Sequence, residues 1–492
     1  MDANSANLGR ALAYALIVPV CLWLGLMLST PTSAVSLVGV GAVVVALALP
    51  LLLRWHSFLL ICLWNAAVVV PFLPGQPPAW VPLAGLSLAI AAVNRTLRHR
   101  SQFIWVPSVA IPLLVLAVVI TLTVAIRGIG ARAFGSELWG AKRYLWVFGA
   151  VLGYFALTAA RVQQREANWL AGLFFLSGTT AIMSDLAFAG GRAFYWLFMF
   201  FPTDVAFHQA MSADTFKRFT GIAWMAQAGT WFMLLRYGIR GILDLLRPWR
   251  LLLFVGLFLF GLFGGFRSSI ILFGVLFMTQ FWFERLLWTR LFFVVLSGAL
   301  LVGGVVVGFA ERLPLSVQRS LSFLPIEVHP AARQDAQGTL DWRLQMWRVV
   351  LPEVPQYLWL GKGYTFSGTD FVLVQESIRR GMFTAYEDTL VSGNYHNGPL
   401  TLLIPFGLPG ALAFVAFLWG GWRVLQRNYR HGPPELKRAN TFLIAYFSAR
   451  LLFFLIFYGQ FDLDLMVFTG TVGLSLAING GICSPSPPAA SQ

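Results

Sequence analysis

Residues 399–422 read PLTLLIPFGLPGALAFVAFLWGGW and contain no charged side chain. As a helix, a stretch of this length can cross the hydrocarbon core of a bilayer, which takes about 20 mostly apolar residues. Similar stretches recur along the whole chain, so that 58% of its 492 residues are hydrophobic and only 11% are charged. Soluble domains carry about 25% charged residues. The sequence therefore predicts an all-α polytopic membrane protein.

Fourteen apolar stretches are candidates for membrane spans, and because three of them are short we expect about 12–14 transmembrane helices. They lie near residues 11–28, 35–53, 57–73, 80–94, 103–126, 144–160, 168–187, 220–237, 250–265, 268–283, 291–310, 399–422, 440–458 and 461–479. If the N-terminus is cytoplasmic, the cytoplasmic loops carry most of the Lys and Arg residues, as the positive-inside rule requires. The outer 127–143 loop, which is also basic, is the exception.

One connection, residues 311–398, is far longer than the others and is predicted to lie on the outer face. Loops of this length usually carry function. Residues 339–350 have apolar side chains at helical spacing, with Thr339 or Asp341 available as N-cap, so we expect short amphipathic helices here. Pro352 and Pro355 should end that helix.

The large loop divides the chain into three predicted parts. Residues 1–249 form an N-terminal transmembrane helix bundle, residues 250–480 form a second region that includes the loop, and residues 481–492 form a disordered tail. The net charge of +15 does not indicate a nucleic-acid partner, because the cations lie in short clusters between apolar stretches. No cytoplasmic loop is long enough for a nucleotide-binding fold, and we expect no cofactor and no metal.

Two arginines are candidates for binding an anion on the outer face. Arg267, in GLFGGFRSSI (residues 261–270), interrupts an apolar stretch and precedes two serines at a predicted helix start, where anions are favoured. A snorkelling arginine at the membrane interface is the alternative interpretation. Arg343 lies one helical turn from Trp347 on the predicted loop helix. The alternative interpretation is that it lies on a solvated face of that helix and binds nothing.

His396 lies at the mouth of the span that begins near residue 399. A half-buried histidine there can be neutral near pH 7 and can accept a proton from a hydroxyl. Its alternative role is structural, as a helix-start residue hydrogen-bonded to Asn394 or Asn397. The pair Asp462 and Asp464 has the D-x-D spacing of a metal site, with solvated acids at a helix end as the alternative.

Several motifs together resemble the O-antigen ligase and polymerase superfamily. HNGPL (396–400), followed by GLPG (407–410), is similar to the family's His-Asn-x-x-Leu…Gly-Leu-x-Gly signature. DWRLQMWRVVLPEVP (341–355), followed by GKGY (361–364), is similar to its preceding motif, and FRSS (266–269) to an earlier Ser-Arg-Gly motif. The resemblance covers roughly residues 250–480, and it implies that these residues form the catalytic region, with the 311–398 loop on the periplasmic side. The last motif departs from the family at both residues that flank the arginine.

The resemblance implies a metal-independent, inverting glycosyltransferase in the bacterial inner membrane, with its active site on the periplasmic side. His396 would be the catalytic base, Arg267 and Arg343 would bind the diphosphate of an undecaprenyl diphosphate carrier, and Trp347, Asn397 and Lys362 would support them. The donor is a lipid-linked oligosaccharide or polysaccharide. The acceptor stays open between a lipid A core, a growing surface polysaccharide and a protein.

A transporter or flippase of the same lipid-linked glycan is the main alternative function. Transporters commonly show paired repeats and ionisable residues near the bilayer midplane. In this sequence only Arg450 lies clearly inside a predicted span, with Asp462 or Asp464 as its expected partner, and the two halves show no repeat. The sequence therefore favours the glycosyltransferase.

Overall fold

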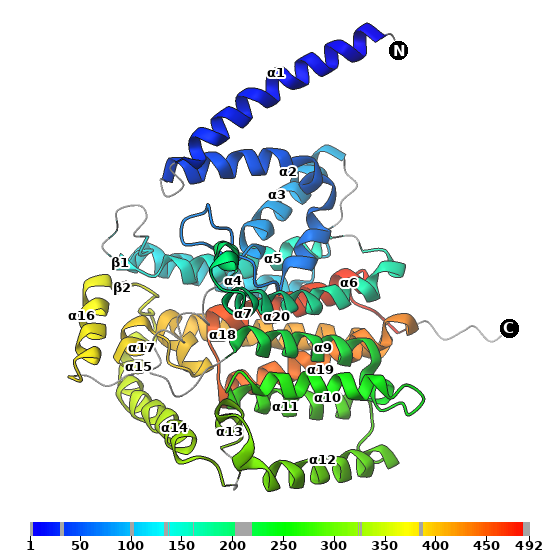
Figure 1. Cartoon of the computed structure of the whole chain (residues 1–492), viewed down its shortest axis with the longest axis vertical. Helices are drawn as coiled ribbons and strands as arrows, with labels where there is room; N and C mark the ends of the chain where they lie inside the picture. Colours follow the sequence, from blue (N-terminus) through cyan, green and yellow to red (C-terminus); the bar gives the residue numbers. More distant parts are fainter. Residues whose placement is uncertain are drawn as a thin grey trace, which may run out of the picture.

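In the part of the chain that the structure describes, the protein is an α-helical bundle with one two-stranded sheet, as the computed structural model in Figure 1 shows. The structure describes residues 3–29, 34–98, 103–131, 136, 138–160, 162–201, 219–322, 324, 327–382 and 387–485. The elements are α1 (Ala3–Leu28), α2 (Ala34–Leu63), α3 (Trp80–Arg98), α4 (Pro107–Arg127), β1 (Leu138–Trp139), α5 (Ala141–Thr158), α6 (Gln164–Leu176), η2 (Ser177–Ala181), α7 (Ile182–Ala189), η3 (Arg192–Met199), α9 (Thr220–Ile242), α10 (Trp249–Leu262), α11 (Arg267–Phe283), α12 (Arg290–Gly308), η4 (Ala310–Arg312), α13 (Leu315–Leu321), α14 (Pro330–Val350), η5 (Leu351–Glu353), α15 (Val354–Tyr357), β2 (Phe366–Ser367), α16 (Gly368–Arg379), α17 (Glu387–Ser392), α18 (Gly398–His431), η6 (Pro434–Leu436), α19 (Lys437–Leu452), η7 (Phe453–Phe457) and α20 (Phe461–Asn479).

Within the described part of the chain, eight helical segments are long and apolar enough to cross a membrane. They are Ala46–Leu63, Trp80–Leu97, Pro107–Arg127, Gln164–Ala189, Arg290–Gly308, Gly398–His431, Pro434–Phe457 and Phe461–Asn479. Three shorter apolar helices, Ile17–Met27, Trp249–Leu262 and Arg267–Phe283, are also present. The predicted fold class, a multi-pass all-α membrane protein, is confirmed.

The second and third predicted spans are wrong as separate helices, because α2 continues from Ala34 to Leu63. The sequence indicated a loop at Arg54 and His56, but polar side chains do not interrupt the backbone hydrogen bonds of a helix. The break comes after Leu63, where residues 64–79 contain four prolines and have no regular helix. One crossing is therefore removed from the predicted count.

The C-terminal helices form the centre of the bundle. Most of α20 is buried, and α18 and α19 are also largely covered, whereas the spanning part of α12 has no buried residue. In Figure 1, α5, α18 and α20 lie in the middle of the molecule, while α1 and α12 lie at its opposite ends. The last residues of the predicted disordered tail, 486–492, lie outside the described residues.

The described part of the 311–398 segment contains helices, as predicted, although α14 is longer than expected, at 21 residues. The helix expected over residues 339–350 ends at Val350 before the two prolines, but it begins earlier, at Pro330. Its N-cap is His329, whose Nδ1 accepts a hydrogen bond from the backbone N–H of Ala331 (3.3 Å). The predicted caps are wrong because Pro330 is itself favourable in the first helical turn.

A kink in α18 joins the long segment to the bundle. Gly407 has φ 64° inside the helix, a conformation that favours glycine. The N–H of Leu408 donates to the Leu358 carbonyl, and the N–H groups of Lys362 and Gly363 donate to carbonyls of α18 at 2.9 and 3.0 Å. The glycine-rich turn at 361–364 is thus fixed against the kink.

Candidate active site

His396 lies in the short connection between α17 and α18, directly before the cap of α18. It has φ 48°, in the left-handed region that residues other than glycine rarely adopt. Asn397 is the N-cap, since its Oδ1 accepts a hydrogen bond from the N–H of Leu400 (3.1 Å). The strained backbone at His396 is therefore held next to a well-formed helix start, and Asn397 has a structural role there.

Two aromatic rings enclose the imidazole of His396. The ring of Trp342, on α14, lies edge-on at a centroid distance of 5.3 Å. The ring of Tyr458, in the connection between η7 and α20, lies at a centroid distance of 5.2 Å. Nδ1 of His396 is buried and makes no hydrogen bond within the described part of the protein. The alternative that Asn394 or Asn397 holds this nitrogen is therefore not supported, since Oδ1 of Asn394 is also buried without a partner there.

The surroundings of His396 keep its ring neutral. Burial, reinforced by the positive charge of Arg343, lowers the pKa of His396 from 6.5 to about 4. Burial disfavours the charged imidazolium, and a neighbouring cation disfavours it further. At neutral pH the imidazole can therefore accept a proton, which is what a general base requires.

Arg343 lies on α14 beside the same two rings. Its guanidinium carbon is 5.8 Å from the Trp342 centroid and 5.6 Å from the Tyr458 centroid, both within cation–π range. Its Nε is buried without a hydrogen bond in the described residues. Burial lowers the pKa of Arg343, and the nearby Arg319 acts in the same direction. The interpretation of Arg343 as a solvated helix face is thus not supported.

Arg319 is a third cation at this site, and the sequence analysis missed it. It lies on α13, is almost fully buried, and donates from Nη1 to the carbonyl of Gly265 (2.6 Å). Gly265 belongs to the turn before Arg267, the first residue of α11. Arg319 therefore connects the α10–α11 turn with the surroundings of Arg343. Its only sequence signal is one basic residue among many in the 311–398 segment.

Two of the predicted supporting residues have structural partners. Trp347 donates its indole Nε1–H to the carbonyl of Tyr395 (2.8 Å), which fixes the residue before His396. Nζ of Lys362 lies 3.6 Å from a carboxylate oxygen of Glu353 in a half-exposed ion pair. Trp347 is accordingly a positioning residue of the site, whereas the contacts of Lys362 belong to the turn against α18.

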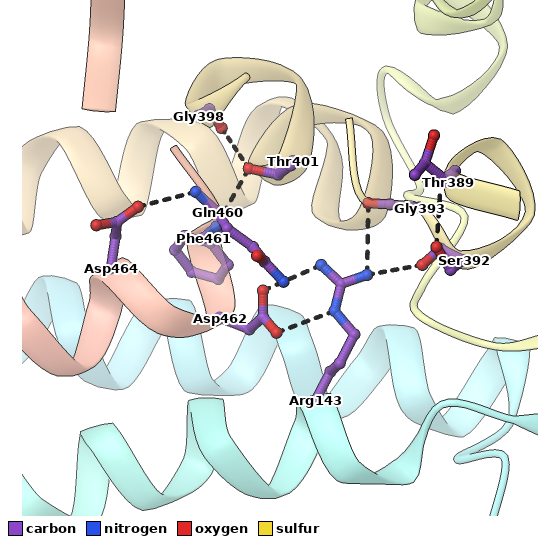
Figure 2. A network of polar contacts seen from close by, with 10 residues as sticks. All are labelled: Arg143, Thr389, Ser392, Gly393, Gly398, Thr401, Gln460, Phe461, Asp462 and Asp464. Carbon is purple, nitrogen blue, oxygen red and sulfur yellow. Dashed lines mark hydrogen bonds and ion pairs between the residues drawn. The ribbon is translucent and has the colours of Figure 1, made fainter. Parts of the chain in front are cut away.

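A buried ion pair anchors the loop that carries His396 (Figure 2). Arg143, on α5, makes two hydrogen bonds to the carboxylate of Asp462, both at 3.0 Å. Its Nη1 also donates to the carbonyls of Ser392 and Gly393, at 2.9 and 3.4 Å. One guanidinium thus joins α5, the start of α20 and the end of α17.

Asp464, two residues further along α20, has a different partner. Its Oδ1 accepts a hydrogen bond from Nη2 of Arg450 (2.5 Å), and its Oδ2 accepts from the backbone N–H of Gln460 (2.8 Å). Asp462 and Asp464 are both buried. The interpretation of the pair as solvated acids is therefore wrong, and the arginines occupy the carboxylates that a D-x-D metal site would use. The expected pairing of Arg450 with one of these acids is confirmed.

Most residues of this site lie in a part of the chain that matches a known protein family. Residues 251–415 match a family model described as O-antigen ligase. A search of curated proteins finds no match to the chain. His396, Arg267, Arg319 and Arg343 fall inside the matched residues, whereas Tyr458 lies beyond them.

Proposed function

We propose that this chain, whose residues 251–415 form an O-antigen ligase domain, is an inverting, metal-independent glycosyltransferase. The family implies a ligase or glycosyltransferase activity on lipid-linked glycans. We infer the finer assignment, transfer from undecaprenyl diphosphate to an acceptor hydroxyl on the periplasmic face of the inner membrane. The observation that supports it is a neutral, buried imidazole beside an arginine that has no carboxylate partner in the described residues.

The arginines would bind the diphosphate of the donor. Diphosphate is the leaving group, so negative charge increases on its bridging oxygen as the bond to the sugar breaks. A guanidinium offers a planar fork of donors that matches phosphate oxygens and is most effective where water is excluded. Arg343 presents such a group from a half-buried position, and Arg319 and Arg267 lie on the adjoining elements. Arg267 keeps its proposed role as a diphosphate ligand.

His396 would be the general base. The acceptor oxygen forms a bond to the anomeric carbon from the side opposite the diphosphate, and the bond between that carbon and the diphosphate oxygen breaks. The hydroxyl proton moves to the free imidazole nitrogen, and the bonding electrons leave with the lipid diphosphate. Attack opposite the leaving group inverts the anomeric configuration. Trp342 and Tyr458 would hold the ring in place and limit access of water.

The same geometry bears on the transporter alternative. Transporters place ionisable residues near the bilayer midplane for cargo or coupling ions. Arg450, the candidate for such a role, is bound to Asp464, so its charge already has a partner. The groups around His396 instead lie at the start of α18, where Trp342 and Arg343 of α14 meet Tyr458. We therefore favour group transfer, with residues 250–480 as the catalytic region and residues 1–249 as the supporting bundle.

The decisive experiment is a transfer reaction with purified components. The full-length protein receives an undecaprenyl-diphosphate-linked glycan and, separately, a lipid A core, a free glycan or a protein acceptor, with and without EDTA. Product formation that EDTA does not reduce, and that His396→Gln abolishes, is expected. We favour the lipid A core as acceptor. Movement of intact donor across vesicles without any product would instead indicate a transporter.

A further inference from the structure

A basic cavity lies at the end of the bundle opposite His396. It has a volume of about 450 Å³ and is bordered by the C-terminal halves of α9 and α11, the end of α18 and the start of α19. Arg267, at the first residue of α11, belongs to the active-site end, and this cavity begins at the helix's other end, roughly 25 Å away at 1.5 Å per residue. The cavity is thus separate from the candidate active site.

Cations dominate the lining of this cavity. Arg240, Arg285, Lys437 and Arg438 line it, and Arg430 lines a second cavity of about 280 Å³ that shares Arg285 with the first. Across the described part of the chain, none of these five cations forms an ion pair with a carboxylate. Lys437 donates from Nζ to the carbonyl of Tyr429 (2.7 Å), and no carboxylate of the described residues neutralises the charge of any of the five, so their charges can attract an anionic ligand.

Glu284 is the acidic residue in the lining, and its carboxylate accepts hydrogen bonds from the backbone of α9. Gly238, with φ 64°, interrupts α9 and directs the N–H groups of Ile239 and Arg240 toward the carboxylate, at 2.8 and 3.3 Å. Nε2 of Gln280 donates to the same carboxylate at 2.7 Å. Glu284 thus holds α9 to α11 through hydrogen bonds, and it does not form an ion pair with the cations beside it.

The second cavity is aromatic on its other side. Trp282, Phe283, Trp422 and Tyr429 line it, and Phe283 and Tyr429 also border the basic cavity, so the two cavities are adjacent. The side chain of Trp282 is largely exposed, as is common for tryptophan at the level of lipid headgroups. Cations next to an aromatic, partly apolar surface match a ligand that has an anionic head and a hydrocarbon body.

We propose that these two adjacent cavities, which we call the basic cavity pair, together bind one anionic phospholipid. Its phosphate would lie among the arginines and its glycerol and first acyl carbons along the aromatic side. Basic pockets between transmembrane helices attract anionic headgroups, and a cavity of this size can hold one. The lipid would belong to the leaflet opposite the active site, and its binding does not depend on the proposed transfer reaction.

The competing explanation is that these cations only fix the orientation of the helices in the membrane. Such a role needs positive charge near the span ends but no particular placement. It therefore predicts that neighbouring basic residues at the same end contribute equally to any attraction for anionic lipid. Arg247 and Arg427 provide this comparison, because both are exposed at this end and neither lines the cavities.

The test uses the purified full-length protein, delipidated and then offered phosphatidylglycerol and phosphatidylcholine in equal amounts, with retained lipid counted by native mass spectrometry. We expect phosphatidylglycerol to be retained about tenfold more strongly. The double variant Arg285→Gln, Arg438→Gln should lose this preference, and the matched double variant Arg247→Gln, Arg427→Gln should keep it. Arg438→Gln alone gives a milder second test if the first double variant unfolds.

Three results would overturn the proposal. Equal retention of the two lipids by the wild-type protein would show that no anionic lipid site exists. Equal loss of preference in both double variants would leave only a general effect of charge. Inorganic phosphate that stabilises the protein against heat, without any preference for phosphatidylglycerol, would make the cavity a site for a soluble anion.

Discussion

Replacement of His396 by glutamine tests the proposed general base directly. Glutamine keeps similar bulk and hydrogen-bonding capacity but cannot accept a proton near neutral pH. We expect the chemical step to slow by about 10² to 10⁴-fold while donor binding persists, because a general base acts in the transition state. Single-turnover kinetics with saturating donor measures the step, and retention of labelled donor measures binding.

The pH dependence of the wild-type enzyme should show where His396 titrates. The donor-free protein holds the pKa of His396 at about 4, through burial and the charge of Arg343. The profile of kcat/KM, which reports the free enzyme, should therefore fall only near pH 4. Once the donor is bound, its diphosphate opposes the field of Arg343, which raises the pKa of His396. The acidic limb of kcat should accordingly lie at higher pH than that of kcat/KM.

The same titration should appear in the stability of the protein. Because the pKa of His396 is about 4 when folded and 6.5 ordinarily, the unfolded chain binds more protons between these values. The free energy of unfolding must then fall as the pH falls from 6.5 to 4, by at most about 3 kcal/mol. His396→Gln should remove this part of the slope in thermal unfolding measured at several pH values.

Specific results would refute this reasoning. Near wild-type turnover of folded His396→Gln would reduce the histidine to a structural residue. A kcat/KM limb near pH 6.5 would mean that neither burial nor Arg343 acts on the ring as the structure indicates. If the free energy of unfolding of the variant fell with pH as steeply as that of the wild type, other groups would cause the loss of stability in acid.

Three further predictions concern the surroundings of His396. Arg343→Lys should lower kcat/KM about tenfold or more, because lysine lacks the planar fork, whereas Arg348→Lys, on the exposed side of the same helix, should be mild; equal effects would contradict the diphosphate role. Tyr458→Phe should keep most activity and Tyr458→Leu should lose about 10²-fold in kcat, as expected for a ring that positions the base; equal rates would show that the ring is dispensable. Asp462→Asn should reduce the free energy of unfolding by about 3 kcal/mol, because Arg143 would stay buried beside a neutral group, and an unchanged melting temperature would contradict this.

The parts of the site that share a local motif could be predicted from the sequence. His396 precedes a span, and Arg343 and Trp347 lie at helical spacing on one loop helix. These residues could therefore be identified as candidates from local sequence patterns. Their meeting depends on the 311–398 segment folding back over the mouth of α18, and the resemblance supplied that expectation. Arg319 gave no such signal, because only the folded chain shows that it is buried against the α10–α11 turn.

Ion pairs between residues far apart in the chain could not be predicted from the sequence. Arg143 and Asp462 come together from α5 and α20, and no local pattern links them. Two of the four cations in the basic 127–143 loop, which departed from the positive-inside pattern, make such contacts. Arg143 binds Asp462, and Nε of Arg127 donates to the carbonyl of Gly361 (3.1 Å). These arginines hold elements together, so they carry no information about the membrane side.

The buried arginines that stabilise the fold differ from the arginine of the candidate active site in whether a carboxylate partner is present. Arg143 and Arg450 each have a buried aspartate as partner, as a charge in a low-dielectric interior requires. Arg343 is half-buried beside aromatic rings, with no ion pair in the described residues, and its charge also depresses the pKa of His396. Such an arrangement weakens the fold unless an anion completes it, and it makes the base stronger when that anion arrives. The bound diphosphate would then neutralise the charge of Arg343 and, by the same interaction, raise the pKa of His396 and make it a stronger base.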